Sequence, residues 1–170
     1  KKHMKNLFLA VLVSATLFAC SEAKKEESTI AIEHIFKPTY TDNFKIGDQK
    51  NVLLAEELHQ AIFAKDFKKV EEALSDTAVF NNEDGSVLKG KPAIIDFMKK
   101  NFSAIKIKNF KIIGIIPTVG ENGHQWVNIW DQADVELPDG TTQKLLWFDA
   151  FRFENGKVVG FTGFVKPRNE

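Results

Sequence analysis

The chain has 170 residues, and its 23 basic and 23 acidic side chains give a formal net charge of zero. This balance argues against a nucleic-acid partner, and the length fits a leader segment followed by one domain with a good core. Because the sequence has a single cysteine, no disulfide can form within the chain.

The first 20 residues have the pattern of a secretory signal. Three lysines, Lys1, Lys2 and Lys5, precede an apolar run at residues 7–19, which is shorter than the roughly 20 residues that a spanning helix needs. The run ends in the letters LFAC, which resemble a bacterial lipobox. We therefore expect residues 1–19 to be a lipoprotein signal peptide, with Cys20 lipidated as the mature N-terminus. An ordinary cleaved signal, a membrane anchor and a buried helix are the alternatives.

The residues after Cys20 predict a tether between a membrane and a folded domain. Residues 20–43 begin with a small, charged stretch that cannot pack, so they read as a flexible tether and lead-in to a domain at residues 44–170. Removing residues 1–19 takes away three lysines and leaves 20 basic and 23 acidic residues. We expect the protein in the cell envelope, on the outer membrane of a Gram-negative bacterium, held by the lipid at Cys20.

The first half of the domain reads as helices around a small hairpin. Asp48 can cap a helix that runs to about Ala64 and carries His59 on its apolar stripe, and Asp66 can cap a shorter second helix. Strands at 77–81 and 86–89 flank an Asp-Gly turn, and a proline in the first turn opens a third helix after residue 90.

The second half reads as four long strands. They span residues 106–118, 124–137, 142–154 and 157–166, with Asp-Gly and Asn-Gly turns before the last two. Helices followed by an antiparallel meander are typical of an α+β domain, in which the helices pack on one face of a curved sheet.

Turn geometry predicts which residues of these strands share a face. Two-residue turns would place Asp149 opposite Trp130 and beside Thr162. One face is then apolar and aromatic, and we expect it to line a ligand pocket with Asn128, Trp130, Trp147, Phe151 and Thr162. Asp131, Val127, Ile129 and Phe148 would lie on the other, outer face. A one-residue error in register would reverse these assignments.

Asp149 is the candidate catalytic residue, since a carboxylate on an apolar face is costly unless it is bonded, paired or protonated. It would act as an acid, a base or a hydrogen-bond donor in the pocket; alternatively it is a structural carboxylate, satisfied by Thr162, a backbone amide or water. His59 could face the same cavity or be a packed core residue. The sequence has no metal-ligand spacing, nucleophile elbow or phosphate loop, so we expect neither a metal nor a cofactor.

The order of the elements resembles the nuclear transport factor 2-like (NTF2-like) superfamily, which includes SnoaL-like and ketosteroid-isomerase-like domains. The resemblance covers about residues 44–167 and is carried by four segments: AKDF at 64–67, LSDTAVF at 74–80, GKPAIIDF at 90–97 and WFDAFRFENGKV at 147–158. It implies a cone-shaped α+β fold with a pocket at its open end. Asp149 matches the isomerase aspartate that binds the developing oxyanion. The isomerase base and tyrosine would fall near Asn81 and Leu58, which cannot fill these roles, so we do not expect steroid isomerase activity.

Three functions fit these observations. The first is an anchored, non-catalytic domain that binds a small hydrophobic ligand; we favour it because no complete catalytic constellation is visible. The second is a SnoaL-like isomerase, cyclase or dehydratase in which Asp149 and His59 lie within hydrogen-bond reach. The third is a homodimeric interaction module that pairs through the outer sheet face. An open cavity beside Asp149 with two or more titratable groups would favour the enzyme.

Overall fold

The computed structural model describes residues 33–168. The expected signal peptide at residues 1–19 and the lipidation site Cys20 lie outside the described residues. Within residues 33–168, no helix has the length and apolar character needed to cross a membrane.

Within the described residues, three helices form close to where the sequence predicts them, although the N-cap of α2 is Gln49 and not Asp48. In α2 (Lys50–Phe63) the first turn is bonded by Asp48, whose Oδ1 accepts from Lys50 N at 2.9 Å. In α3 (Phe67–Ala73) the cap is Asp66, which accepts from Lys69 N at 3.2 Å. α4 (Lys91–Phe102) has a proline in its first turn and follows a glycine at φ +83°.

Seven strands form one sheet in the order β1-β4-β5-β6-β7-β2-β3. The predicted meander of four long strands is confirmed, and all neighbours in the sheet are antiparallel except β2 and β7, which pair in parallel. The bounds are β1 (Phe44–Ile46), β2 (Leu74–Asn81), β3 (Val87–Lys89), β4 (Lys106–Gly120), β5 (Gln125–Glu136), β6 (Thr142–Glu154) and β7 (Lys157–Pro167).

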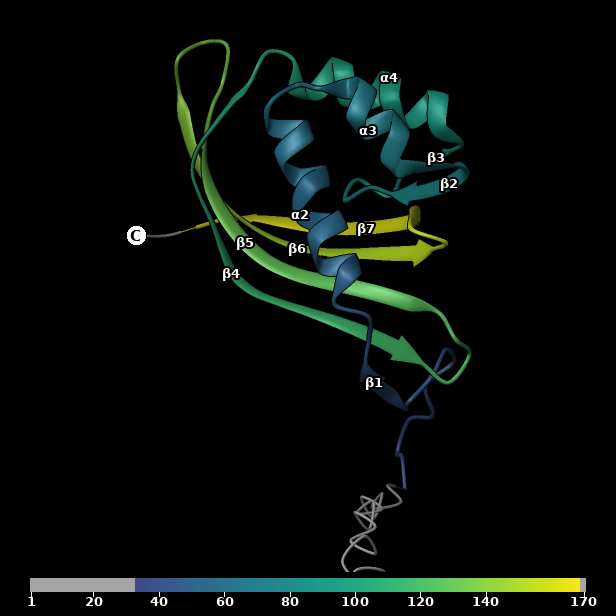
Figure 1. Ribbon diagram of the computed structural model, residues 1–170. Helices are drawn as coiled ribbons and strands as arrows, with labels where there is room; N and C mark the ends of the chain where they lie inside the picture. The colour runs from purple at the N-terminus through teal and green to yellow at the C-terminus, as the bar shows by residue number, and fades with distance from the viewer. Residues whose placement is uncertain (1–32, 169–170) are drawn as a thin grey trace, which may run out of the picture. The chain divides into compact units, whose positions relative to one another are not determined.

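The long strands bend around the helices, so that α2 lies in the hollow of the sheet (Figure 1). Register shifts in β4 accompany the bend, as bulges do in strongly curved sheets. The core fills this hollow with apolar side chains from α2, α4 and the inner face of the sheet, among them Leu58, Ile94, Ile129 and Phe151. This is the α+β cone that the sequence predicts.

The lead-in contacts the start of β5 and the turn before it through Tyr40. Its hydroxyl hydrogen-bonds His124 Nδ1 and accepts from Trp126 Nε1 at 3.1 Å. Residues just before β1 are therefore attached to the turn between β4 and β5.

The predicted strand register is wrong by one residue in two places. Asp149 lies opposite Ile129 and Gly163, not Trp130 and Thr162. Between β5 and β6 the pairing starts at Glu136 and Thr142, so the connection has five residues rather than two.

The second error comes from a bulge. The Asn-Gly turn between β6 and β7 is as expected, but the register shifts between Arg152 and Phe153. All pairs farther from the turn, from Arg152 with Gly160 onward, are therefore moved by one residue. β5 and the part of β7 from Gly160 onward are therefore turned over relative to the prediction, whereas β6 and Val158 keep their predicted face. As a result Val127 and Ile129, expected on the outer face, are fully buried, whereas Trp130 is 42% exposed and packs on Phe148.

Candidate active site

A cavity of about 330 Å³ lies on the inner side of the sheet, among α2, α4 and strands β4 to β7. Its wall is mostly apolar and rich in aromatic side chains, among them Phe63, Phe110, Trp147, Phe151, Phe161 and Phe164. Glu83 and Asn101 also line it, and because both are exposed they mark its mouth. The size and the apolar wall are typical of sites for small organic ligands.

A second, larger hollow of about 690 Å³ lies beside α2 and α3 and the turn between β6 and β7. The charged side chains along it, such as Glu57, Lys69 and Lys157, are exposed to solvent. It is a surface groove without a buried titratable group, so the smaller cavity is the better candidate.

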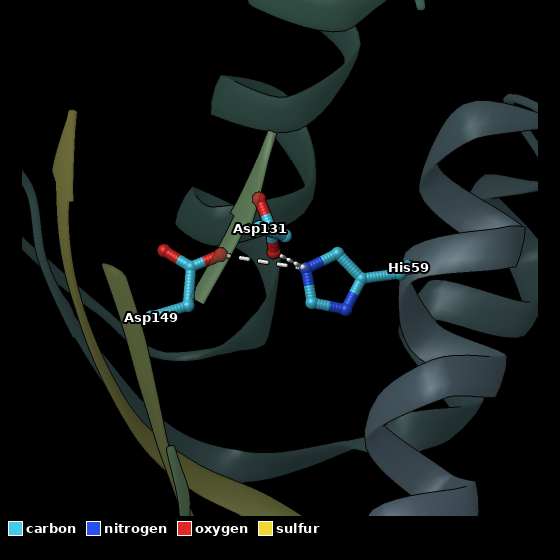
Figure 2. Close-up of side chains that lie close together, drawn as sticks. All are labelled: His59, Asp131 and Asp149. Atoms are coloured by element: carbon cyan, nitrogen blue, oxygen red, sulfur yellow. Dashed lines mark hydrogen bonds and ion pairs between the residues drawn. The ribbon is translucent and has the colours of Figure 1, made fainter. Parts of the chain in front are cut away.

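Three buried polar side chains meet at the smaller cavity (Figure 2). His59 projects from α2, Asp131 from β5 and Asp149 from β6, and none is more than 7% exposed. His59 Nε2 lies 3.4 Å from Asp149 Oδ2 and 3.7 Å from Asp131 Oδ2. The predicted approach of His59 to Asp149 is therefore confirmed, and a second carboxylate joins the pair.

The other nitrogen of His59 determines what the ring offers to the two acids. Nδ1 lies 3.1 Å from the carbonyl oxygen of Ala55, which can only accept a hydrogen bond, so Nδ1 is the protonated donor. A neutral ring would then aim the lone pair of Nε2 at two carboxylate oxygens. That arrangement is repulsive unless a positive species, such as a second proton, lies between them.

The pKa shifts agree with this requirement. Burial lowers the pKa of His59, but the hydrogen bond that the ring donates to Asp149 and the charges of both aspartates outweigh it, and the net shift is upward. Burial, followed by the charge of Asp149, raises the pKa of Asp131 to about 7, although His59 opposes the shift. Asp131 Oδ2 has no hydrogen-bond partner.

The cluster can therefore give and take a proton near neutral pH, at the edge of an apolar cavity. Groups with these properties carry out general acid–base chemistry. The same three atoms all lie within 4.8 Å of one another and include the nitrogen and oxygen donors that divalent ions prefer. Spacing along the sequence indicated no metal site because the three residues come from separate elements.

The structure brings together only part of the predicted pocket. His59, Trp147, Asp149 and Phe151 line the cavity. Three predicted lining residues lie on the other face of the sheet because of the register errors: Asn128, Trp130 and Thr162.

Asn81, at the position of the isomerase base, points away from the cavity as well: its amide donates to Thr162 Oγ1 at 3.4 Å. The sequence prediction missed Asp131. The alternation of side chains along β5 could have revealed it. Asp131 is an even number of residues from Val127, Ile129 and Val135, so it shares their buried face.

Comparison with known proteins agrees with this fold. The model of the SnoaL-like domain matches residues 55–161. The chain is similar to an epoxide hydrolase of M. tuberculosis described as LEH-like, at 17% identity over 68% of this chain and 81% of that one, with a TM-score of 0.53. It is also similar to a steroid delta-isomerase from Pseudomonas aeruginosa, at 19% identity over 71% and 82% of the two chains and a TM-score of 0.53.

A further solved structure, an NTF2-like protein from Burkholderia xenovorans, shares 15% identity over 72% of this chain and 93% of its own, with a TM-score of 0.55. Among curated proteins, none matches the sequence. At such identities the solved structures establish the fold alone. The matched segment covers most of the domain, and on this ground the chain belongs to the SnoaL-like family, with the NTF2-like fold.

Proposed function

We propose that this domain catalyses acid–base chemistry on a small, neutral and largely apolar substrate, of the isomerase, cyclase or dehydratase type. One observation carries the proposal: His59 Nε2 and the carboxylates of Asp131 and Asp149 converge at a cavity of about 330 Å³ whose wall is otherwise mainly apolar. Buried titratable groups are costly in such surroundings, and they are common where catalysis uses them.

The geometry supports distinct roles for the three side chains. Asp131 has the free carboxylate oxygen, so it is the group that takes a proton from carbon next to a substrate carbonyl. His59 is held through Nδ1 by the carbonyl oxygen of Ala55, so its Nε2–H is the donor that turns from Asp149 to the substrate carbonyl oxygen as negative charge develops there. In an isomerisation Asp131, whose proton can exchange with water, returns a proton to a different carbon, so the enzyme ends in its starting state.

The alternative is a domain that holds a small hydrophobic ligand without turnover, and the aromatic wall favours it as much as it favours a substrate site. In that case the three polar groups would only orient a hydroxyl or carbonyl group of the ligand. The two functions differ in whether a proton moves between the ligand and solvent.

Deuterium exchange separates these functions. The full-length chain would be incubated in D₂O with a panel of monocyclic and bicyclic ketones, and incorporation next to the carbonyl followed by mass spectrometry. We expect enhanced exchange in at least one ketone, and a loss of about 100-fold or more in Asp131→Asn. Trp130→Phe, which changes the outer face of the sheet, should exchange like the wild type.

Two results would overturn the catalytic proposal. Saturable quenching of tryptophan fluorescence by a ketone, without exchange of any panel member, would identify a ligand-binding domain. Exchange that persists unchanged in Asp131→Asn and His59→Gln would place the chemistry elsewhere.

We also propose that the domain works at the cell envelope, tethered through a lipid on Cys20. The support is the sequence alone: three lysines, a short apolar run and the LFAC ending. Mass spectrometry of the mature N-terminal peptide should find Cys20 acylated, and Cys20→Ser should release the protein from sedimented membranes. An unmodified Cys20 would contradict the proposal.

A further inference from the structure

We propose that His59, Asp131 and Asp149 also form a binding site for one divalent transition-metal ion, which takes the place of the proton at the centre of the cluster. Metal binding itself does not depend on the proposed catalysis. Its consequence does: an ion at this position would occupy the groups that move protons and would switch the activity off.

The distances fit a metal centre. An imidazole nitrogen and a carboxylate oxygen bound to the same tetrahedral ion, each about 2.1 Å from it, lie roughly 3.4 Å apart. His59 Nε2 is 3.4 Å from Asp149 Oδ2 and 3.7 Å from Asp131 Oδ2. The two distances from His59 Nε2 therefore match this spacing before any ion enters, and the donor atoms of all three residues lie within 4.8 Å of one another.

The orientation of His59 fits as well. Ligand histidines usually donate their second ring N–H to a carbonyl or carboxylate, which leaves the first nitrogen free for the metal. Here Nδ1 donates to Ala55 O at 3.1 Å, so the lone pair of Nε2 faces the two aspartates (Figure 2).

An independent observation points to a missing partner. Asp131 is 2% exposed, and its Oδ2 has no hydrogen-bond partner although it is directed at the same point as the other two donors. A buried carboxylate oxygen without a partner is costly, and one proton on His59 cannot satisfy both aspartates at full strength. A doubly charged ion can bind both at once.

The donor set defines the class of ion. One imidazole nitrogen and two carboxylate oxygens, without a thiolate, suit Zn²⁺, Co²⁺, Mn²⁺ or Fe²⁺ better than Cu⁺, whereas Mg²⁺ and Ca²⁺ prefer oxygen alone. The adjoining cavity leaves coordination positions for water or for an oxygen of a bound ligand.

Cobalt provides the test, because Co²⁺ bound to nitrogen and oxygen donors absorbs visible light. Untagged full-length chain, freed of metal with a chelator and desalted, would be titrated with Co²⁺ and then with Zn²⁺. We expect absorption that saturates at one equivalent, its loss as Zn²⁺ displaces Co²⁺, and a rise in the midpoint of thermal unfolding.

Variants assign the site. Asp131→Asn and His59→Gln should each weaken Co²⁺ affinity by at least about 10-fold, and Asp149→Asn provides a third variant if one of these fails to fold. His124→Gln, which removes a histidine near the sheet edge, should bind like the wild type. No saturable absorption, or absorption that the site variants leave unchanged, would overturn the proposal. Because the readout needs no substrate, it can fail while ketone exchange succeeds, and the reverse.

Discussion

The charge state of Asp131 links the site to the stability of the whole domain. This carboxyl has an ordinary pKa of 3.8, and in the fold burial, followed by the charge of Asp149, raises the pKa to about 7. Between these pH values the folded chain holds a proton that the unfolded chain has released. The free energy of unfolding therefore falls as the pH rises, by about 1 kcal/mol for each pH unit.

His59 extends the same trend to higher pH. Its pKa is raised above 6.5 in the fold, so the stability that its protonated form contributes is present below pH 6.5 and is lost as the pH rises through the folded pKa. We expect urea denaturation of the wild type, with a chelator present, to show a loss of roughly 3 kcal/mol between pH 4 and pH 7.

Asp131→Asn removes the titrating group and keeps its shape. The unfolding free energy of this variant should change little between pH 4 and pH 7, and at pH 8 the variant should be more stable than the wild type, because no charge is then buried at this position. Asp96→Asn, which removes an exposed carboxylate on α4, is the control and should follow the wild-type profile. Parallel profiles for the wild type and Asp131→Asn would refute the reasoning, since they would show that Asp131 is ionised throughout this range.

Further substitutions test the two faces of the sheet and the attachment of the lead-in. In Gly163→Ala the new Cβ would lie 2.8 Å from Asp149 Oδ1. We therefore expect the free energy of unfolding, measured by thermal denaturation, to fall by about 1 to 3 kcal/mol, and ketone binding to weaken. Wild-type stability would contradict the pairing of Asp149 with Gly163. Trp147→Ala should weaken ketone binding by about 10-fold or more, as measured by calorimetry, whereas Trp130→Ala should not. A larger loss of affinity in Trp130→Ala than in Trp147→Ala would mean that the ligand binds on the face of the sheet that carries Trp130. Tyr40→Phe removes hydroxyl hydrogen bonds to the sheet edge and should cost about 1 kcal/mol in urea denaturation; no loss would show that the lead-in does not stabilise the domain.

The helices and strands were predictable because the chain marks their ends with strong local signals. Asp48 and Asp66 bond the first turns of their helices, and Asn155-Gly156 forms the expected two-residue turn. Such signals act over a few residues, so they can be read without knowledge of the rest of the fold. The parallel pairing of β2 with β7 was not predictable in this way, because no short turn joins the two strands.

The faces of the strands were harder to predict than their ends. The register depended on one connection that has five residues instead of two and on one bulge, and each moved a strand by a single residue. In β5 the side-chain pattern carried the correct answer: Val127, Ile129 and Val135 are aliphatic, β-branched and at alternate positions, which favours burial of the set that contains Asp131. Periodicity within the strand was better evidence there than the length of a turn.

The bulge in β7 also explains why Asp149 is available to the cavity. Without the extra residue Val159, Thr162 would lie beside Asp149, and its hydroxyl could donate to the carboxylate. The shift places Gly163 there, and any Cβ at that position would come within 2.8 Å of Asp149 Oδ1. Because the neighbouring strand offers no side-chain donor, the carboxylate takes its side-chain hydrogen bond from His59 across the cavity. Without the inserted residue, Thr162 would hydrogen-bond Asp149. With it, Asp149 is left to act with His59.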